Sequence, residues 1–257
     1  MKRTSKELKR IARDILNNRY TIPMGAFVTA GLIPSVIEIP FSLSDVAYPT
    51  TSQIVICCLA QFLILLVGQV LDAGVAQIHL NMTRAKEFKL GQIFDPFRQG
   101  ADRFFGAAFL FFIFTLLLCL PMFAGTVYFY YTDVTATSIV ALIAGILVSL
   151  IFVIAFTLNY QMVFFFLLDY PKMKVINAFK ESRLLMKGNK KRFLYILFSF
   201  IGWNLLVVCS LGIAGLWVTP YQTQTIITLY LDCTGELDRI PVRNYNPQSA
   251  PSSNPFI

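Results

Sequence analysis

Long apolar stretches alternate along this chain with shorter segments that hold nearly all of its charged residues. The clearest apolar stretches, which contain no charge, are residues 104–131, 137–168 and 193–211. A helix needs roughly 20 apolar residues to cross a hydrocarbon core of about 30 Å, and each stretch has about that length or more. The pattern therefore predicts an all-α fold, a polytopic transmembrane helical bundle.

Three less regular stretches bring the predicted number of spans to about six. Residues 54–80 form an apolar run that carries Asp72, and residues 20–43 form one that is broken by three prolines. Residues 213–231 are polar for a span, so this helix would need protein neighbours rather than lipid around its Gln and Thr side chains. We expect it to form the sixth span.

The two ends of the chain differ from the apolar stretches. Residues 4–17 repeat apolar positions at helical spacing, and Thr4 with Glu7 offers a capping box, which predicts an amphipathic helix. The basic region that precedes the first span is too long for a cleaved signal peptide. Residues 233–257 are rich in Pro, Ser and Asn and are expected to form a disordered cytoplasmic tail. The remainder, residues 1–232, is predicted to be a single transmembrane domain.

Composition supports the membrane assignment and limits the partners. Hydrophobic residues make up 56% of the chain, charged residues 14%, and the mean hydropathy is +0.63. These values lie outside the range of soluble globular domains, so membrane lipids are the expected surroundings. A net charge of +8 would also suit nucleic acid, but the distribution of the bases argues against nucleic acid as a partner.

All 22 Lys and Arg residues lie in four segments on one side of the predicted spans. The alternate connections, residues 44–53 and 132–136, contain none. Basic residues are retained on the cytoplasmic side during insertion, so both termini are predicted to be cytoplasmic. An even number of spans brings Arg239 and Arg243 to that side as well. The basic face would then contact lipids of the inner leaflet, anionic ones above all, with membrane proteins as further candidate partners.

A recurring pair of residues suggests internal repetition. An arginine followed by an aromatic residue begins three of the predicted spans: Arg19-Tyr20, Arg103-Phe104 and Arg192-Phe193. A short amphipathic segment precedes each pair and two spans follow it, although Pro96 weakens the second of these segments as a helix. We expect three repeats of an interfacial amphipathic helix plus a two-span hairpin. The alternative, that inner loops of basic membrane proteins commonly have this character, stays open.

Three segments resemble the signatures of a known family. They are "IFDPFRQG" (93–100), "LLDYPKMKVINAFKESRLLMKGNKKRFLYILFSFIGWNLLV" (167–207) and "GIAGLWVTPYQTQTIITLY" (212–230). They are similar to domain-of-unknown-function family 975, integral membrane proteins mostly from Gram-positive bacteria. The resemblance covers nearly the whole chain and implies a six-span helical fold in a bacterial plasma membrane. It supplies no catalytic residues.

The chain offers little of what enzymes and metal sites require. His79 is the single histidine, and no cysteine spacing suits a metal. Catalytic and nucleotide-binding motifs are missing from the sequence. We therefore expect no cofactor, no metal and no enzymatic activity.

One stripe of polar residues lies on the second predicted span. Gln61, Gly68, Asp72 and His79 are spaced at i, i+7, i+11 and i+18, which places them on one face at 100° per residue. A carboxylate inside a membrane suggests a path for protons or ions. The alternative is a face turned toward the bundle interior, with Asp72 hydrogen-bonded. Asn204, in the middle of the fifth span, is expected to form an interhelical hydrogen bond.

The bases before the fifth span are the candidate contacts to anionic lipid: Lys187, Lys190, Lys191 and Arg192. Asp169 and Asp232 close two spans at the same side and are expected to be boundary residues or partners of bases. The functional hypothesis is a non-enzymatic membrane organiser that binds lipid or protein partners through a basic cytoplasmic face. The alternative is a small transporter or channel that uses the polar stripe.

Overall fold

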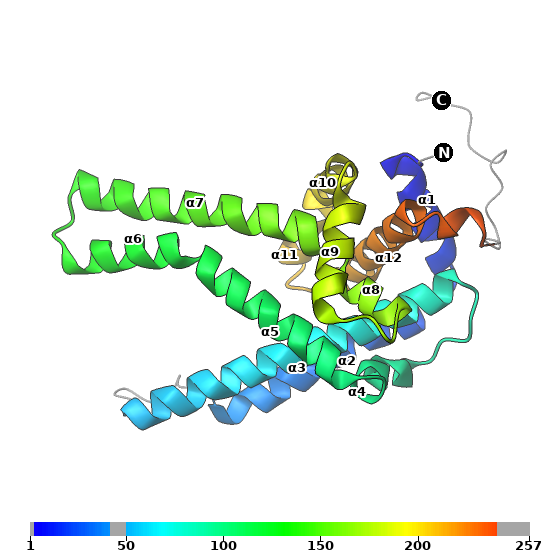
Figure 1. The fold of residues 1–257 in the computed structure, drawn as a ribbon, viewed down its shortest axis with the longest axis horizontal. Coiled ribbons are helices and arrows are strands. Elements are labelled where there is room, and N and C mark those ends of the chain that lie inside the picture. The colour runs from blue at the N-terminus through cyan, green and yellow to red at the C-terminus, as the bar shows by residue number, and fades with distance from the viewer. Residues whose placement is uncertain (1–2, 42–49, 241–257) are drawn as a thin grey trace.

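The computed structural model describes residues 3–41 and 50–240, and all regular structure in these ranges is helical (Figure 1). The elements in chain order are α1 (Ser5–Leu16), α2 (Thr21–Glu38), η1 (Ile39–Phe41), α3 (Thr51–Thr83), η2 (Leu90–Phe94), α4 (Asp95–Arg98), α5 (Ala101–Leu118), α6 (Leu120–Tyr131), α7 (Ala136–Tyr160), α8 (Val163–Asp169), α9 (Val175–Met186), α10 (Lys190–Ser199), α11 (Ile201–Cys209), α12 (Gly215–Cys233) and η3 (Glu236–Asp238). The predicted all-α fold is confirmed.

Five helical segments are long and apolar enough to cross a membrane. They are Thr21–Phe41, Thr51–Thr83, Ala101–Leu118, Ala136–Asp169 and Lys190–Cys209. The sixth predicted span corresponds to α12, which is helical but too polar to belong to this group, so the six-span count stays a prediction. Protein does surround α12, as its sequence requires, because Gln224, Thr225 and Thr228 are fully buried.

Three of the predicted spans are each divided into two helices. Between α5 and α6 the division falls at Cys119, next to Pro121, whose nitrogen cannot donate a helical hydrogen bond. Between α7 and α8 it falls at residues 161–162. Between α10 and α11 it falls at Phe200, whose backbone N–H donates to the Leu197 carbonyl at 3.1 Å. This tighter i to i+3 turn breaks the helix without any proline.

Two helical hairpins, α2–α3 and α6–α7, extend toward the same side of the molecule and diverge from each other (Figure 1). We call these the distal arms. The elements α1, α4, α8, α9, α12 and η3 gather at the opposite side, which we call the basic end. The main hydrophobic core lies at the basic end and includes Leu8, Phe104, Phe193 and Tyr230.

A helix is present where the amphipathic helix was predicted at residues 4–17, and it is α1. Thr4 and Glu7 form the expected capping box. The apolar side of α1, including Leu8 and Ile11, is fully buried, and α1 packs on α10 and α12. Its apolar side therefore faces protein and not lipid, which differs from a helix that lies freely in the headgroup layer.

The other two amphipathic segments have different outcomes. Residues 175–186 form α9, whose buried positions include Ala178, Phe179 and Met186. The second segment is split into η2 and α4, as Pro96 leads one to expect. The order of elements therefore follows the predicted repeat, but the middle unit has no continuous amphipathic helix.

Close packing holds the α6–α7 arm together. A Cβ atom added at Gly145 of α7 would collide with the carbonyl oxygen of Pro121 in α6. A Cβ at Gly125 of α6 would lie 2.9 Å from the carbonyl oxygen of Ala141 in α7. The two backbones can approach this closely only because glycine occupies both positions. Ser149 adds a hydrogen bond from the Met122 N–H to its hydroxyl oxygen at 3.0 Å.

The prediction of a disordered tail from residue 233 is wrong for the first residues of that segment. Cys233 is the last residue of α12, and η3 follows at Glu236–Asp238. Leu237 is only 2% exposed because it packs into the core of the basic end. The rest of the predicted tail, residues 241–257, lies outside the described residues, as does the connection at 42–49.

Candidate functional site

The four predicted polar residues lie in separate environments. Gln61 is near the far end of the α2–α3 arm, where its amide donates to Glu38 at 3.0 Å. Asp72 borders a cavity, and His79 is buried nearer the basic end. Asn204 is exposed on α11, and its side chain forms no hydrogen bond within residues 3–41 and 50–240. The prediction that Asn204 forms an interhelical hydrogen bond is therefore wrong for the described part of the chain.

His79 belongs to a buried network that joins α3 to α12. Its Nδ1 lies 2.8 Å from Oε1 of Gln224, an acceptor, so Nδ1 carries the proton. The Gln224 amide donates to the Thr83 hydroxyl at 2.6 Å, and Thr83 donates to the His79 carbonyl at 2.9 Å. Every distance suits a stable hydrogen bond, so the network aligns two helices. His79 thus faces the bundle interior.

A partly buried arginine at the basic end connects three segments that are far apart in the sequence. Arg84, just after α3, binds both carboxylate oxygens of Asp169 at 2.7 and 2.9 Å. It also binds Glu236 of η3 at 2.7 Å, while the Tyr230 hydroxyl donates to Asp169 at 2.7 Å. Burial alone would lower the pKa of Arg84, but the hydrogen bonds and charges of Asp169 and Glu236 outweigh it and raise that pKa. The guanidinium therefore stays charged and paired.

A second ion-pair cluster surrounds Asp232, whose side chain is 2% exposed. Arg192 binds one carboxylate oxygen of Asp232, and Arg3 binds the other at 3.1 Å. Arg3 also pairs with Asp238 at 2.7 Å. Burial opposes the charge of Arg3, but Asp232 and Asp238 outweigh it and raise the pKa of Arg3.

These two clusters test earlier expectations about charged residues. The expectation that Asp169 and Asp232 are partners of bases is confirmed. The assignment of Arg192 as a lipid contact is wrong, because its guanidinium is held by Asp232 and by the Arg3 carbonyl inside the protein. Arg192 therefore serves the packing of the basic end.

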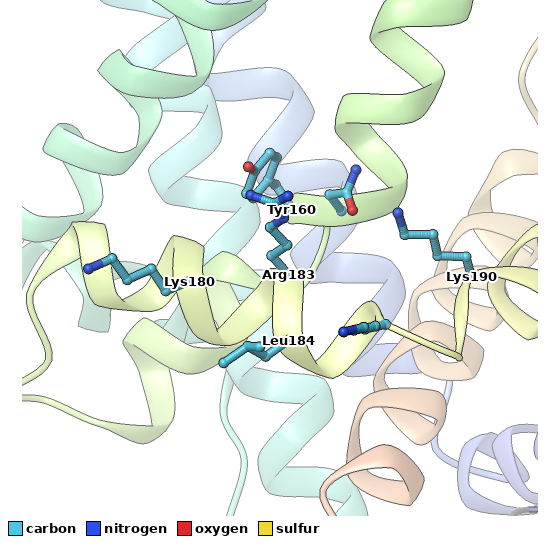
Figure 2. Close-up of a pocket in the computed structure, with 7 residues that line it drawn as sticks. Tyr160, Lys180, Arg183, Leu184 and Lys190 are labelled. Atoms are coloured by element: carbon cyan, nitrogen blue, oxygen red, sulfur yellow. The ribbon is translucent and has the colours of Figure 1, made fainter.

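Four other bases near this end of the molecule line an open cleft of about 810 Å³ (Figure 2). We call it the basic cleft, and its lining residues are Asn159, Tyr160, Lys180, Arg183, Leu184, Lys187 and Lys190. Two of the predicted lipid contacts, Lys187 and Lys190, belong to it. Lys191 is exposed but does not line the cleft.

Figure 2 shows how the basic side chains are arranged. Arg183 points from α9 toward Tyr160 at the end of α7, and Lys190 extends from the start of α10 toward the same end of α7. Lys180 lies nearer the start of α9 than Arg183, and its side chain is directed away from Lys190. The lining contains no carboxylate, and none of its four cations has an ion pair within the described ranges. The cleft therefore has an uncompensated charge.

Lys180 and Arg183 were not among the predicted site residues, although a signal for them exists. Lys180, Arg183, Leu184 and Lys187 follow the spacing i, i+3, i+4 and i+7, which places them on one side of α9. The contribution of Asn159 and Tyr160 has no such local signal, because the cleft forms only when α7 packs beside α9.

The chemistry that this cleft offers is the binding of anions. Lysine and arginine side chains supply charge-assisted hydrogen bonds to phosphate or carboxylate oxygens. Tyr160 adds a hydroxyl group, and Leu184 adds apolar surface at the edge. An oxyanion attached to an apolar chain would match both features.

Comparison with known proteins assigns the chain to a family. No curated protein and no solved structure matches it. Residues 1–236 match the family described as Protein of unknown function (DUF975), a range that includes the three resembling segments, α12 and the first residue of η3. Because the match covers nearly all of the sequence, the chain belongs to the DUF975 family.

Proposed function

We propose that this membrane protein is a non-enzymatic membrane organiser that binds anionic lipid headgroups in the basic cleft. The observation that carries the proposal is the presence of four cations, without a carboxylate among them, in one open cleft. Protein partners that present phosphate or carboxylate groups would use the same chemistry.

The depth of the cleft supports a lipid headgroup as the occupant. Lys190 is the first residue of the apolar segment Lys190–Cys209, and Tyr160, the last residue of α7, lines the same cleft. Residues at the ends of membrane spans lie at the level of the headgroups, where tyrosine and lysine are favoured. A lipid phosphate would therefore be at the same depth as the cations.

The ion pairs of the other bases also support a lipid headgroup as the occupant of the cleft. Arg3, Arg84 and Arg192 are neutralised by carboxylates within the protein. The cleft residues Arg183 and Lys187 have no such partner in residues 3–41 and 50–240. Each base near an anionic leaflet contributes about 1 kcal/mol of attraction before screening by salt. Four together would select anionic over neutral lipid.

The proposed location is a bacterial plasma membrane, with both termini and the basic end in the cytoplasm. The positions of all 22 Lys and Arg residues support this orientation. Reporter fusions test it at six positions: external after Thr50, Asp133 and Gly215, and internal after Gln92, Gly188 and Pro247. An external reporter after Pro247 would contradict the sixth span.

Lipid binding is tested with the purified full chain in nanodiscs of mixed phosphatidylcholine and phosphatidylglycerol. Native mass spectrometry then counts the lipids that stay bound. The cleft variant changes four residues to Gln: Lys180, Arg183, Lys187 and Lys190. A matched variant changes four exposed bases outside the cleft: Lys86, Arg98, Lys172 and Lys174. Both lose the same charge.

We expect the wild-type chain to retain phosphatidylglycerol preferentially, and the cleft variant to bind it at least about tenfold more weakly, a loss of about 1.4 kcal/mol. The matched variant should keep its preference. A titration with inorganic phosphate distinguishes a lipid from a soluble ligand: displacement of phosphatidylglycerol at a low phosphate concentration would indicate a site for free phosphate. Equal losses in both variants would contradict a specific cleft.

The alternative function, a small transporter or channel, has weaker support. Gln61 and His79 bind different partners at opposite ends of α3 and do not form a continuous path with Asp72. The cavity beside Asp72 is the feature of the described residues that favours this alternative.

A further inference from the structure

A second cavity, open to the surface at one side, lies between helices of the bundle, away from the basic cleft. It has a volume of about 320 Å³ and is bounded by α2, α3, α8 and α12. Asp72 supplies the one charged group of its lining. Gln69, Gln161, Thr219 and Thr223 are the other polar groups around it. The cavity therefore offers one negative charge among neutral hydrogen-bonding groups.

Asp72 has no partner of its own within the described chain. The hydrogen bond expected for it is not formed, and no Lys or Arg lines the cavity. Asp72 precedes the end of α3 at Thr83 by 11 residues, about 16 Å of helix. Asp72 is exposed on the protein surface at the mouth of the cavity, and a carboxylate at this depth in a membrane is unfavourable unless a proton or an opposite charge compensates it.

The aromatic lining indicates which opposite charge fits. Phe27 of α2 and Phe164 and Phe165 of α8 border the same cavity as the carboxylate. The faces of aromatic rings attract organic ammonium groups. A bare metal ion, in contrast, requires a tight shell of oxygen ligands, and a cavity of about 320 Å³ is far larger than such a shell. The volume falls at the lower end of the range for small-molecule sites.

We infer that this cavity is a binding site for a small organic cation, with Asp72 as its counter-charge and Phe27, Phe164 and Phe165 around its apolar portion. Gln69, Gln161 and the threonine hydroxyls would orient a polar substituent of the ligand. This inference does not rest on the basic cleft, which has the opposite charge and other lining residues. Each of the two proposed sites can therefore be disproved without affecting the other.

Choline and its neutral isostere 3,3-dimethyl-1-butanol are the probes of choice. They have nearly the same shape and differ by the positive charge. Isothermal titration calorimetry with the purified full chain in an uncharged detergent measures the binding of each. We expect choline to bind, and the isostere to bind at least tenfold more weakly.

Three variants locate the binding. Asp72→Asn should weaken choline binding at least tenfold, because it removes the counter-charge while it keeps the size of the side chain. Glu38→Gln is the matched control, since Glu38 is also on a span but pairs with Gln61 outside this cavity. Phe27→Leu leaves all charges intact and should weaken choline binding several-fold, so it tests the site even if Asp72→Asn fails to fold.

Several results would overturn the inference. Choline binding that is equal in wild type, Asp72→Asn and Phe27→Leu would place the cation elsewhere. Equal binding of choline and the neutral isostere would show that charge plays no part. A thermal stabilisation by Na⁺ that depends on Asp72, without any choline binding, would assign the cavity to a metal cation instead.

Discussion

The basic end and the distal arms of this protein are built on different principles. At the basic end, Arg84 and Asp232 connect segments from both halves of the sequence through buried ion pairs. In the α6–α7 arm, close packing at Gly125 and Gly145 holds two helices together, and the tip residues Tyr130 and Tyr131 are 79% and 80% exposed.

This difference shows where each part obtains its stability. The basic end buries its own apolar side chains and pairs Arg3, Arg84 and Arg192 with carboxylates inside the protein, much as a water-soluble domain does. The arms leave long rows of Leu, Ile and Phe uncovered, so their apolar surface requires the hydrocarbon core of a membrane. Changes at the basic end should therefore affect the whole fold, and changes in the arms should have local effects.

The largest effect is expected from Arg84→Ala. This change leaves Asp169 and Glu236 without their partner, and the cost is about 3 kcal/mol, the lower end for buried pairs, because the side chains of Arg84 and Asp169 are still partly exposed, at 16% and 13%. Chemical unfolding in detergent measures the free energy of unfolding. Lys89→Ala is the control, because the Lys89–Glu87 pair is exposed and should contribute nothing measurable. Equal losses in the two variants would remove the distinction between buried and surface pairs.

A smaller loss is expected from Gln224→Leu. It leaves the His79 ring and the Thr83 hydroxyl with one hydrogen-bond partner fewer, which costs about 2 kcal/mol for buried groups. The same unfolding measurement applies. Gln222→Leu changes a half-buried neighbour in α12 that lies outside this network, and it should be nearly neutral. If Gln222→Leu costs as much, helix surface polarity rather than the network would matter.

Gly145→Ala should act on one arm only. The added methyl group collides with the Pro121 carbonyl and separates α6 from α7, with an overall cost of about 1 kcal/mol because the arm can open without the basic end. Hydrogen exchange in nanodiscs should show lost protection in α6 and in the far part of α7. Gly202→Ala, where the new methyl group meets open space, is the control. Loss of protection at α12 would contradict the independence of the arm.

The smallest effect concerns the first turn of α1. The Thr4 backbone N–H at 2.7 Å and the Thr4 hydroxyl at 2.9 Å donate to Glu7 and lower the pKa of that carboxyl below 4.5. Their contribution to α1 is therefore complete above pH 4.5 and is lost as the pH falls through the lowered pKa. The chemical shift of the Thr4 amide proton, measured by NMR, should follow this titration. Glu7→Gln should abolish the pH dependence, whereas Glu181→Gln should leave it unchanged.

Local signals explain how far the fold could be predicted. The capping box at Thr4 and Glu7 and the uncharged stretches located the helices to within a few residues, because both depend on neighbours in the sequence. The break at Phe200 was missed, since no proline stands there and only the backbone hydrogen bonding changes. The folded conformation of residues 234–240 was not predicted, because it depends on contacts with Arg3 and Arg84, which are far away in the sequence.

The polar stripe shows why the candidate site was harder to predict. Helical spacing does place Gln61, Asp72 and His79 on one side of α3. Gln61 and His79 are nevertheless about 27 Å apart along the axis, and different elements cover the two ends. Glu38 of α2 is hydrogen-bonded to Gln61, and Gln224 of α12 is hydrogen-bonded to His79. Periodicity gives the side of a helix, and only the tertiary fold gives its neighbours.

The bond between Arg84 and Glu236 has a consequence for biosynthesis. The two residues are 152 positions apart, and ribosomes release the chain from its N-terminus. Arg84 and the α2–α3 hairpin are therefore made long before the carboxylate that completes their pairing. Asp169 can pair with this arginine once α8 has been made, and the turn at residue 236, synthesised later still, completes the ion pairs that anchor the first hairpin.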